Sequence, residues 1–235
     1  MLAAQLVIIF LSLLTVAIAI LVVGSYDICF GLYIKTYCKA KTKKRVLALS
    51  FDDGPHPEFT PAVLDILKDN DIKAGFFLVG EMIEKEPGLA ERIHSEGHII
   101  GNHSYSHAKK NTIRKTKAVI EDLKKNEDLI YKITGNRLAF FRPPFGVTNP
   151  NIAAAARFLE YKVIGWSIRS LDTMRKPDEK IIKRVVSQFK PGGMILFHDT
   201  HKGIANILKE VIRKAKEEGY TFVRPDELLN LKAYE

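Results

Sequence analysis

The sequence predicts an α/β protein: a distorted (β/α) barrel of about seven parallel strands, preceded by one N-terminal transmembrane helix. Three observations lead to this prediction. Short apolar runs alternate with longer amphipathic runs over most of the 235-residue chain, which is typical of repeated strand–helix units. Polar residues follow at least five of the apolar runs, as they do where barrel strands end at one mouth. A long uncharged stretch comes before all of these runs.

The uncharged stretch runs from Leu2 to Val23. A helix of this length, at about 1.5 Å per residue, crosses a hydrocarbon core of about 30 Å. A cleaved signal peptide is the alternative, but no basic residue precedes the stretch and it is longer than the usual apolar part of such a peptide. We therefore expect residues 1–24 to form a membrane anchor.

A basic segment follows, and we expect it to be a juxtamembrane linker over residues 25–45. It holds six basic side chains and one acidic one, so five of the nine net positive charges of the chain lie in this segment. The positive-inside rule alone would leave the following domain in the cytoplasm, whereas contact with anionic lipid or wall polymer would also explain the charge. Cys29 and Cys38 lie in this segment, either as a disulfide outside the membrane or as free thiols.

The remaining residues, 46–235, are expected to form one catalytic domain. Its charge is mild and mixed, and it has no phosphate-binding glycine loop, so we expect no nucleic-acid partner. Strands are expected at 46–51, 74–79, 98–101, 139–142, 162–166, 194–197 and 220–223. Helices are expected at 61–70, 87–95, 116–133, 149–159, 178–189, 203–218 and 225–231, several of them with a glycine just past the end. An open doubly wound sheet would also fit this alternation, but it would spread the polar strand ends along a line.

The most informative motif is the run from Ser50 to Pro57, which contains Asp52 and Asp53. Consecutive residues at a strand end start on opposite sides of the strand, and Gly54-Pro55 then turns the chain. One carboxylate can therefore hold a metal ion while the other takes a proton from water.

Two histidines supply further metal ligands. His103 and His107 are four residues apart, and we expect them on a helical turn, with both imidazoles on one face.

The run Arg142-Pro143-Pro144-Phe145-Gly146 has a constraint of its own. Proline has no backbone N–H, so the first main-chain donor after the strand belongs to Phe145, in a rigid turn that suits an oxyanion site. Arg142 can pair with Asp52.

Two later strands also end in residues of interest. His198 ends one strand, in a position to act as a general acid or base. Trp166 ends another strand, with Asp172 six residues later, although a strand tryptophan is more often part of the core.

Together, and in this order, these motifs resemble the polysaccharide deacetylase family, the NodB-homology proteins of carbohydrate esterase family four, over about Val46 to Arg224. The resemblance implies that Asp52 is the catalytic base and that Asp53, His103 and His107 bind the metal ion. It further implies that His198 is the catalytic acid, that Arg142 supports the base, and that Asp172 supports the acid. The substrate contacts that it implies are Pro144, Phe145, Trp166 and Leu196. Zn²⁺ suits this ligand set best, with Co²⁺, Ni²⁺ or Mn²⁺ as alternatives.

One motif departs from the family pattern. The family often has Asp-x-x-Asp-Trp, whereas this chain has Arg169, Asp172 and Thr173 at the three named positions. Asp172 can still tune His198, but the substitutions at Arg169 and Thr173 leave the details of the substrate open.

The resulting functional hypothesis is a metal-dependent hydrolase that removes N-acetyl groups from N-acetylglucosamine units of a cell-envelope glycan, such as peptidoglycan or a chitin-like oligomer. Because that glycan lies outside the cytoplasmic membrane, we expect an extracytoplasmic domain on a membrane anchor, against the positive-inside count. Two alternatives stay open. One is an O-deacetylase or small-amide hydrolase of the same fold, and the other is an inactive, anchored glycan-binding module.

Overall fold

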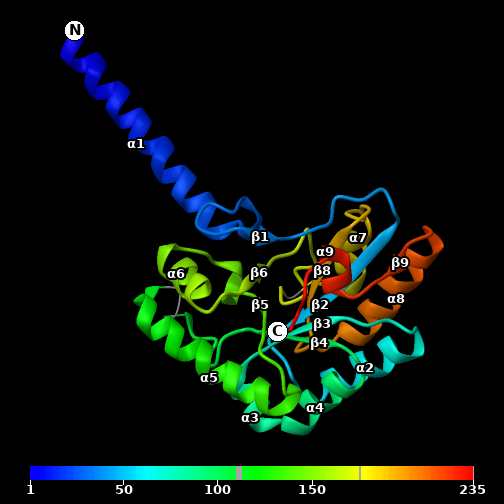
Figure 1. Cartoon of the computed structure of the whole chain (residues 1–235). Coiled ribbons are helices and arrows are strands. Elements are labelled where there is room, and N and C mark those ends of the chain that lie inside the picture. The colour runs from blue at the N-terminus through cyan, green and yellow to red at the C-terminus, as the bar shows by residue number, and fades with distance from the viewer. Residues whose placement is uncertain (110–112, 175, 235) are drawn as a thin grey trace.

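A curved parallel sheet forms the centre of the domain (Figure 1). The structure, a computed structural model, describes residues 1–109, 113–174 and 176–234. In the sheet, the strand order is β1-β6-β5-β4-β3-β2-β8-β7, with β9 paired to β2, and each of these pairs is parallel. The strands are β1 (Thr36–Tyr37), β2 (Val46–Asp52), β3 (Gly75–Leu78), β4 (Ile99–Asn102), β5 (Phe140–Phe141), β6 (Lys162–Ile164), β7 (Ile168–Arg169), β8 (Gly193–His198) and β9 (Thr221–Phe222).

One short segment of chain joins the last strand at one end of the sheet, β7, to the second strand from the other end, β6. β6 pairs with β5 and β7 pairs with β8, yet only residues 165–167 separate β6 from β7. The sheet therefore curls into a barrel-like shape, and the predicted fold class is confirmed. The predicted strand count of about seven left out the two-residue strands β1 and β7, which do not lie in apolar runs bounded by helical patterns as the equally short β5 and β9 do.

Helices surround the sheet (Figure 1). Seven of them were expected from the sequence, whereas the six-residue α3 was not. They are α2 (Phe59–Asp69), α3 (Gly80–Lys85), α4 (Pro87–Ser95), α5 (Thr116–Thr134), α6 (Pro150–Phe158), α7 (Asp178–Val186), α8 (Ile204–Glu217) and α9 (Pro225–Leu229).

The central strand β2 shows how the sequence directs side chains to the two faces of the sheet. Leu47, Leu49 and Phe51 are fully buried and belong to the larger apolar cluster, which also contains the buried side chains of α2 and α8. Ala48 belongs to a second cluster, inside the barrel. Because side chains alternate along a strand, Asp52 shares the inner face with Ala48 and leads into the barrel mouth.

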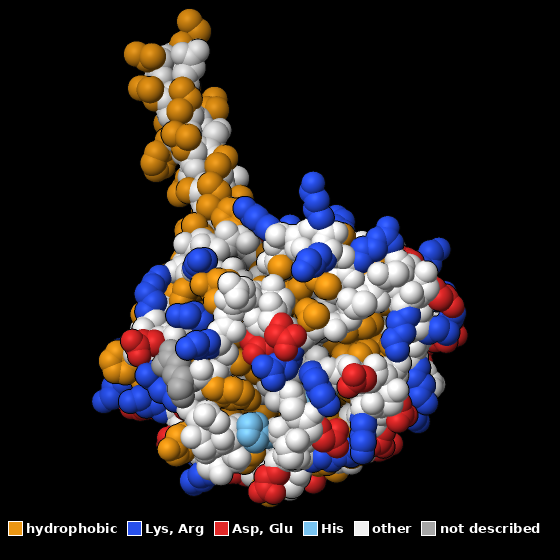
Figure 2. Space-filling view, turned by 45° about the vertical axis from the view of Figure 1, so that its right-hand side comes forward, with side chains coloured by type: hydrophobic (Ala, Val, Ile, Leu, Met, Phe, Trp, Pro, Cys, Tyr) orange, Lys and Arg blue, Asp and Glu red, His pale blue; other side chains and the backbone are white. Residues whose placement is uncertain are grey.

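The chain begins with α1 (Leu2–Tyr26), which extends away from the domain (Figure 1). Its most apolar window has a mean hydropathy of 3.3 and is not buried at all, so by length and composition the helix could cross a membrane. Figure 2 shows its hydrophobic surface and the Lys and Arg side chains around its base.

Part of the segment that we expected to be a linker packs onto the domain. Ile28 is buried in the core, β1 pairs with β6, and Cys29 and Cys38 form a disulfide. The sequence left open whether these cysteines pair. The division of the chain into anchor, linker and domain remains a prediction.

Candidate active site

The carboxyl ends of five strands, β2, β4, β5, β6 and β8, deliver the motif residues to one cavity of about 250 Å³. Arg142 and Asp172 are buried behind its wall, and Pro144 lies beside it. The cavity is lined by Asp52, Asp53, His103, His107, Phe145, Gly146, Trp166, Arg169, Thr173, Leu196 and His198.

Asp52 and Arg142 form a buried ion pair at the base of this cavity. Arg142 Nη1 donates to Asp52 Oδ1 over 2.6 Å, and the arginine is completely buried. The other guanidinium hydrogen bonds go to Ser50 Oγ and to the main-chain carbonyls of Ile164 and Gly165. A fully bonded guanidinium fixes the orientation of its carboxylate partner, so Asp52 has one oxygen held and the other directed toward His103 Nε2, 3.8 Å away.

Asp53, His103 and His107 form a second cluster, beside Asp52. The Nε2 atoms of His103 and His107 lie 3.3 and 3.2 Å from Asp53 Oδ1. Burial opposes the charge on Asp53, but the neighbouring imidazoles of His103 and His107 favour the carboxylate and hold the pKa of the Asp53 carboxyl well below its usual range.

This cluster fits a divalent metal ion. One ligand atom from each residue lies within 4.8 Å of the others. Asp53 Oδ1 and His107 Nε2 are buried and have no hydrogen-bond partner among the described residues. His103 Nδ1 lies 2.7 Å from the Arg142 carbonyl oxygen, a contact that places the proton on Nδ1 and leaves the Nε2 lone pair free for a metal ion. Two imidazoles and a carboxylate are a ligand set typical of zinc.

The prediction that the two histidines lie on a helical turn is wrong. Ser104 and His107 have φ values of +66° and +44°, which no residue of a right-handed helical turn has. Residues outside the motif shape this loop instead: Asn102 Oδ1 accepts from the Ser104 N–H, and Asn126 Nδ2 donates to the Ser104 carbonyl. Spacing alone could not distinguish this loop from a helix, because both bring the rings together.

Phe145 also has a left-handed backbone, with φ of +61°. No main-chain bond from its N–H is found among the described residues, whereas Gly146 N–H donates to Pro143. The neighbouring Gly146 has φ of +69°, and a Cβ there would lie 2.4 Å from the Trp166 ring. The turn therefore holds the Phe145 N–H at the cavity and packs against Trp166. Strained backbone of this kind clusters at functional sites.

On the other side of the cavity, His198 is paired with Asp172. His198 Nδ1 lies 2.8 Å from Asp172 Oδ1, and the His198 main-chain N–H donates to Oδ2 of the same carboxylate. Burial opposes the charge on His198, but the hydrogen bond and charge of Asp172 outweigh it and raise the pKa of His198 to about 9. The imidazole is therefore held as a proton donor, and within the described part of the chain its Nε2 makes no hydrogen bond.

Arg169 and Thr173, the two departures from the family motif, line the same cavity. The Arg169 guanidinium lies 5.6 Å from the Trp166 ring centre, within cation–π range. The substituted motif therefore changes the cavity wall, while Asp172 keeps its contact with His198.

Asp199 is a structural residue that the sequence reading did not assign. It is fully buried, accepts from Thr60 Oγ1 over 2.5 Å, and lies so close to Gly54 that a Cβ there would be 2.2 Å from the carboxylate. Burial raises the pKa of Asp199 to about 7. Asp199 thus supports the turn that carries Asp53. The one feature of the sequence that could have indicated this role is that Asp199 directly follows His198.

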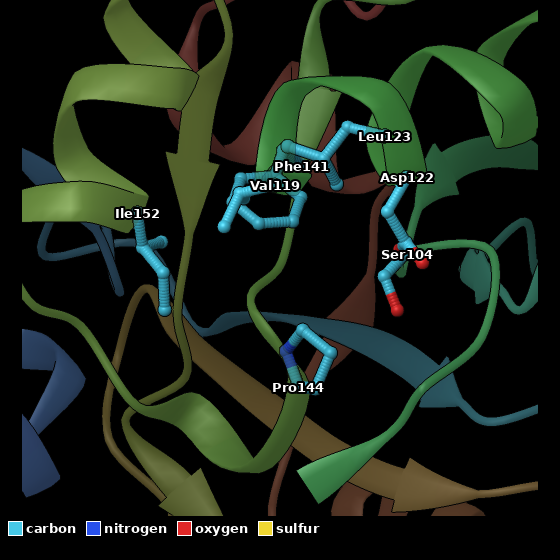
Figure 3. A pocket seen from close by; sticks show the side chains of 7 residues that line it. All are labelled: Ser104, Val119, Asp122, Leu123, Phe141, Pro144 and Ile152. Carbon is cyan, nitrogen blue, oxygen red and sulfur yellow. The ribbon is translucent and has the colours of Figure 1, made fainter. Parts of the chain in front are cut away.

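A small apolar cavity of about 20 Å³ lies behind the loops that carry His103 and Phe145 (Figure 3). It is separate from the catalytic cavity, and only Ser104 and Asp122 among its lining residues are polar. Asp122 accepts from the Tyr105 N–H and from Ser106 Oγ, so this region fixes the histidine loop from behind.

Comparison with known proteins gives consistent matches. A peptidoglycan N-acetylglucosamine deacetylase of Listeria monocytogenes is 37% identical over 83% of this chain, although the match spans only 41% of the length of that relative. A crystal structure of the Bc1960 peptidoglycan N-acetylglucosamine deacetylase superposes with a TM-score of 0.79 and 32% identity, covering 85% of this chain and 95% of that one.

A third match is described as inactive. The structure of BA3943 from Bacillus anthracis, a pseudoenzyme of carbohydrate esterase family four, has a TM-score of 0.77 and 27% identity, covering 83% of this chain and 69% of that one. Residues 39–164, more than half of this chain, match the sequence pattern of the polysaccharide deacetylases. With the motif residues gathered in one cavity and this match, the chain belongs to the polysaccharide deacetylase family.

Proposed function

We propose that this protein is a metal-dependent deacetylase that hydrolyses N-acetyl groups on N-acetylglucosamine units of a cell-envelope glycan. The observation that carries the proposal is the presence, in one cavity, of the Asp53–His103–His107 cluster, the Asp52–Arg142 pair and the His198–Asp172 pair. The named relatives act on peptidoglycan, and that supports this substrate class.

Each group has a part in the proposed reaction. Asp53, His103 and His107 would hold a divalent ion such as Zn²⁺, which when bound would polarise the acetamide carbonyl and make a water molecule more acidic. Asp52 takes a proton from that water while the water oxygen adds to the carbonyl carbon of the acetamide. The Phe145 N–H donates to the former carbonyl oxygen, which becomes negative in this step. His198 gives its proton to the amide nitrogen as the carbon–nitrogen bond breaks, leaving acetate and a free amine on the sugar.

The alternative is an inactive glycan-binding module. Two observations favour it: Arg169 and Thr173 depart from the family motif, and one structural relative is a pseudoenzyme. The retained metal ligands and both acid–base pairs argue against it.

The test is acetate release by the full chain in detergent with Zn²⁺, from N-acetylglucosamine oligomers and from peptidoglycan. We expect release that a chelator and the substitution His103→Ala both abolish. Metal binding without release from either substrate would exclude the proposed deacetylase and leave two alternatives: esters, whose hydrolysis acetylated xylan would report, or small amides. Failure to bind metal would indicate the binding module.

We further propose that α1 anchors the protein and that the domain lies outside the cytoplasmic membrane. The Cys29–Cys38 disulfide supports this location, since such bonds persist in oxidising compartments. Protease added to spheroplasts should digest the domain, and complete protection would place it in the cytoplasm despite the disulfide.

A further inference from the structure

The end of α1 is attached to the catalytic rim of the barrel, the rim that carries the active-site loops. The last carbonyls of a helix lack partners within the helix. Here Thr148 supplies them: its N–H donates to the Ser25 carbonyl over 2.9 Å, and its Oγ1 donates to the Gly24 carbonyl over 3.0 Å. Thr148 itself is buried, in the loop between β5 and α6 that also carries Phe145.

A second set of contacts joins the same segment to the chain around Trp166, which lines the same cavity as Phe145. Cys29 Sγ lies 3.0 Å from the Trp166 carbonyl oxygen, and Gly165 N–H donates to the Tyr37 carbonyl. A Cβ on Gly165 would lie 2.5 Å from Cys38 Sγ, so the disulfide lies directly against the chain that leads into Trp166. The anchor end and the cavity wall are therefore one packed unit, without a flexible linker between them.

This attachment fixes how far the active site lies from the apolar span. The uncharged stretch ends at Val23, next to Gly24, and Phe145 is three residues from Thr148. Three residues span at most about 10 Å. If α1 lies in a bilayer, the cavity is thus held close to the lipid headgroups.

Part of the rim next to the helix exposes apolar side chains. Ile113 is 83% exposed. With Val147 and Asn149 it forms the domain side of a groove. The other side is made of α1 residues, three of them from inside the apolar stretch: Ile18, Leu21 and Val22, followed by Ser25 and Tyr26. Lipid around the helix would therefore also meet this part of the rim. These contacts favour the bilayer around α1 as the occupant of this groove.

We propose that the catalytic rim rests on the membrane surface and that the substrate is an N-acetylated glycan carried on a membrane lipid. This inference rests on the proposed deacetylase function and on the anchor. It narrows the substrate to sugars held near the headgroups, as opposed to glycan in the mature wall further away.

The position of the rim can be measured without any catalysis, because Trp166 is the single tryptophan of the chain and lines the cavity. The full chain is placed in phosphatidylcholine–phosphatidylglycerol vesicles, with or without a nitroxide label on the lipid headgroup. We expect the label to quench Trp166 fluorescence strongly. Equal fluorescence with and without the label would overturn the proposal.

A matched variant carries about twenty Gly and Ser residues inserted between Val23 and Gly24. Such a spacer adds a mean separation of about 25 Å and leaves the Thr148 contacts intact. We expect the spacer variant to lose most of the quenching. Quenching that persists unchanged in the variant would show that the anchor does not set the position of the rim.

The substrate class is tested in the same vesicles with synthetic lipids that carry N-acetylglucosamine on ethylene-glycol spacers of increasing length. The reference spacer is one whose length matches the distance between the membrane surface and the cavity. For the natural chain we expect acetate release to fall roughly eightfold when this spacer is made four times longer, because effective concentration falls roughly as the −3/2 power of spacer length. The Gly-Ser variant should show a flatter dependence. Release by the natural chain that is independent of spacer length, or that rises with it, would overturn the lipid-linked substrate.

A soluble N-acetylglucosamine oligomer, added to the same vesicles with Zn²⁺, serves as the control for chemistry. If it too gives no acetate, the proposed function fails, and the fluorescence result still decides where the rim lies.

Discussion

The two sides of the catalytic cavity differ in how they are built. The metal side, formed by Asp52, Asp53, His103 and His107, is held by buried charge pairs and loop hydrogen bonds from within the barrel. The anchor side, formed by Trp166, Arg169 and Thr173, is backed at Trp166 by the segment that follows α1 and by its disulfide. Under the proposed function the comparison separates two requirements: the first side would carry groups that the reaction needs, whereas the second would shape the space for the rest of the substrate.

The largest loss is expected on the metal side, from Asp52→Asn. An amide cannot accept the water proton, so acetate release should fall by about 10²–10⁴-fold, the usual contribution of a general base. Metal content should be unchanged, because Asp53, His103 and His107 remain. Metal analysis together with the acetate assay measures both.

A control is needed, because Asp52→Asn leaves Arg142 buried without its charge partner. Breaking a buried pair typically costs about 3–5 kcal/mol. Thermal unfolding should therefore show a less stable but folded protein. Substantial turnover in a folded, metal-loaded variant would remove Asp52 from the role of base.

The next effect concerns His198, which lies between the two sides. Asp172 raises the pKa of His198 to about 9, so the imidazole is protonated at neutral pH, and turnover that needs this proton should decline as pH rises through about 9. In Asp172→Asn the charge is lost while burial still disfavours the imidazolium, so the pKa falls. A charged hydrogen bond of about 1.5–3 kcal/mol corresponds to a shift of about one to two pH units.

The pH–rate profile of that variant provides the measurement. Its alkaline limb should move to lower pH, with the acid limb in place. A profile that only drops in height, with both limbs unmoved, would contradict the assignment of His198 as the acid.

These two sides also show what could be predicted from the sequence. The motifs indicated which residues meet, because the carboxyl ends of parallel strands converge in a barrel whatever the details of the loops. The local conformation did not follow from them: His103 and His107 meet through a loop with two left-handed residues, held by Asn102 and Asn126 from outside the motif. Long-range partners of this kind leave no periodic signal.

The anchor side was less predictable for a related reason. Residues 25–45 have the composition of a linker, yet they add β1 to the sheet and place a disulfide behind Trp166. A two-residue strand and a pair of cysteines cannot be assigned partners from one sequence. The structure was needed to show that the anchor side depends on this segment.

A smaller effect is expected from removing the disulfide by the double substitution Cys29→Ser and Cys38→Ser. Closing a loop with a sequence separation of nine residues stabilises a fold by about 2–3 kcal/mol in the chain-entropy treatment. The melting temperature should therefore fall, and KM should rise more than kcat falls, because the support behind Trp166 is weakened while the metal side is intact. Loss of bound metal in the double variant would show that the two sides are not separate.

The smallest effect is expected from Arg169→Ala on the anchor side. Arg169 is exposed and lies over the Trp166 ring, where a cation–π contact contributes about 0.5–1 kcal/mol. If the anchor side shapes only substrate binding, KM for N-acetylglucosamine oligomers should change by roughly two- to fivefold, in line with that energy, and kcat should stay nearly constant. The matched control is Arg184→Ala: Arg184 donates to the Arg169 carbonyl and lies outside the cavity lining, so KM should stay near the natural value. A fall in kcat as large as that of Asp172→Asn would instead place Arg169 among the groups that act on the reacting atoms, and the division between the two sides would have to be abandoned.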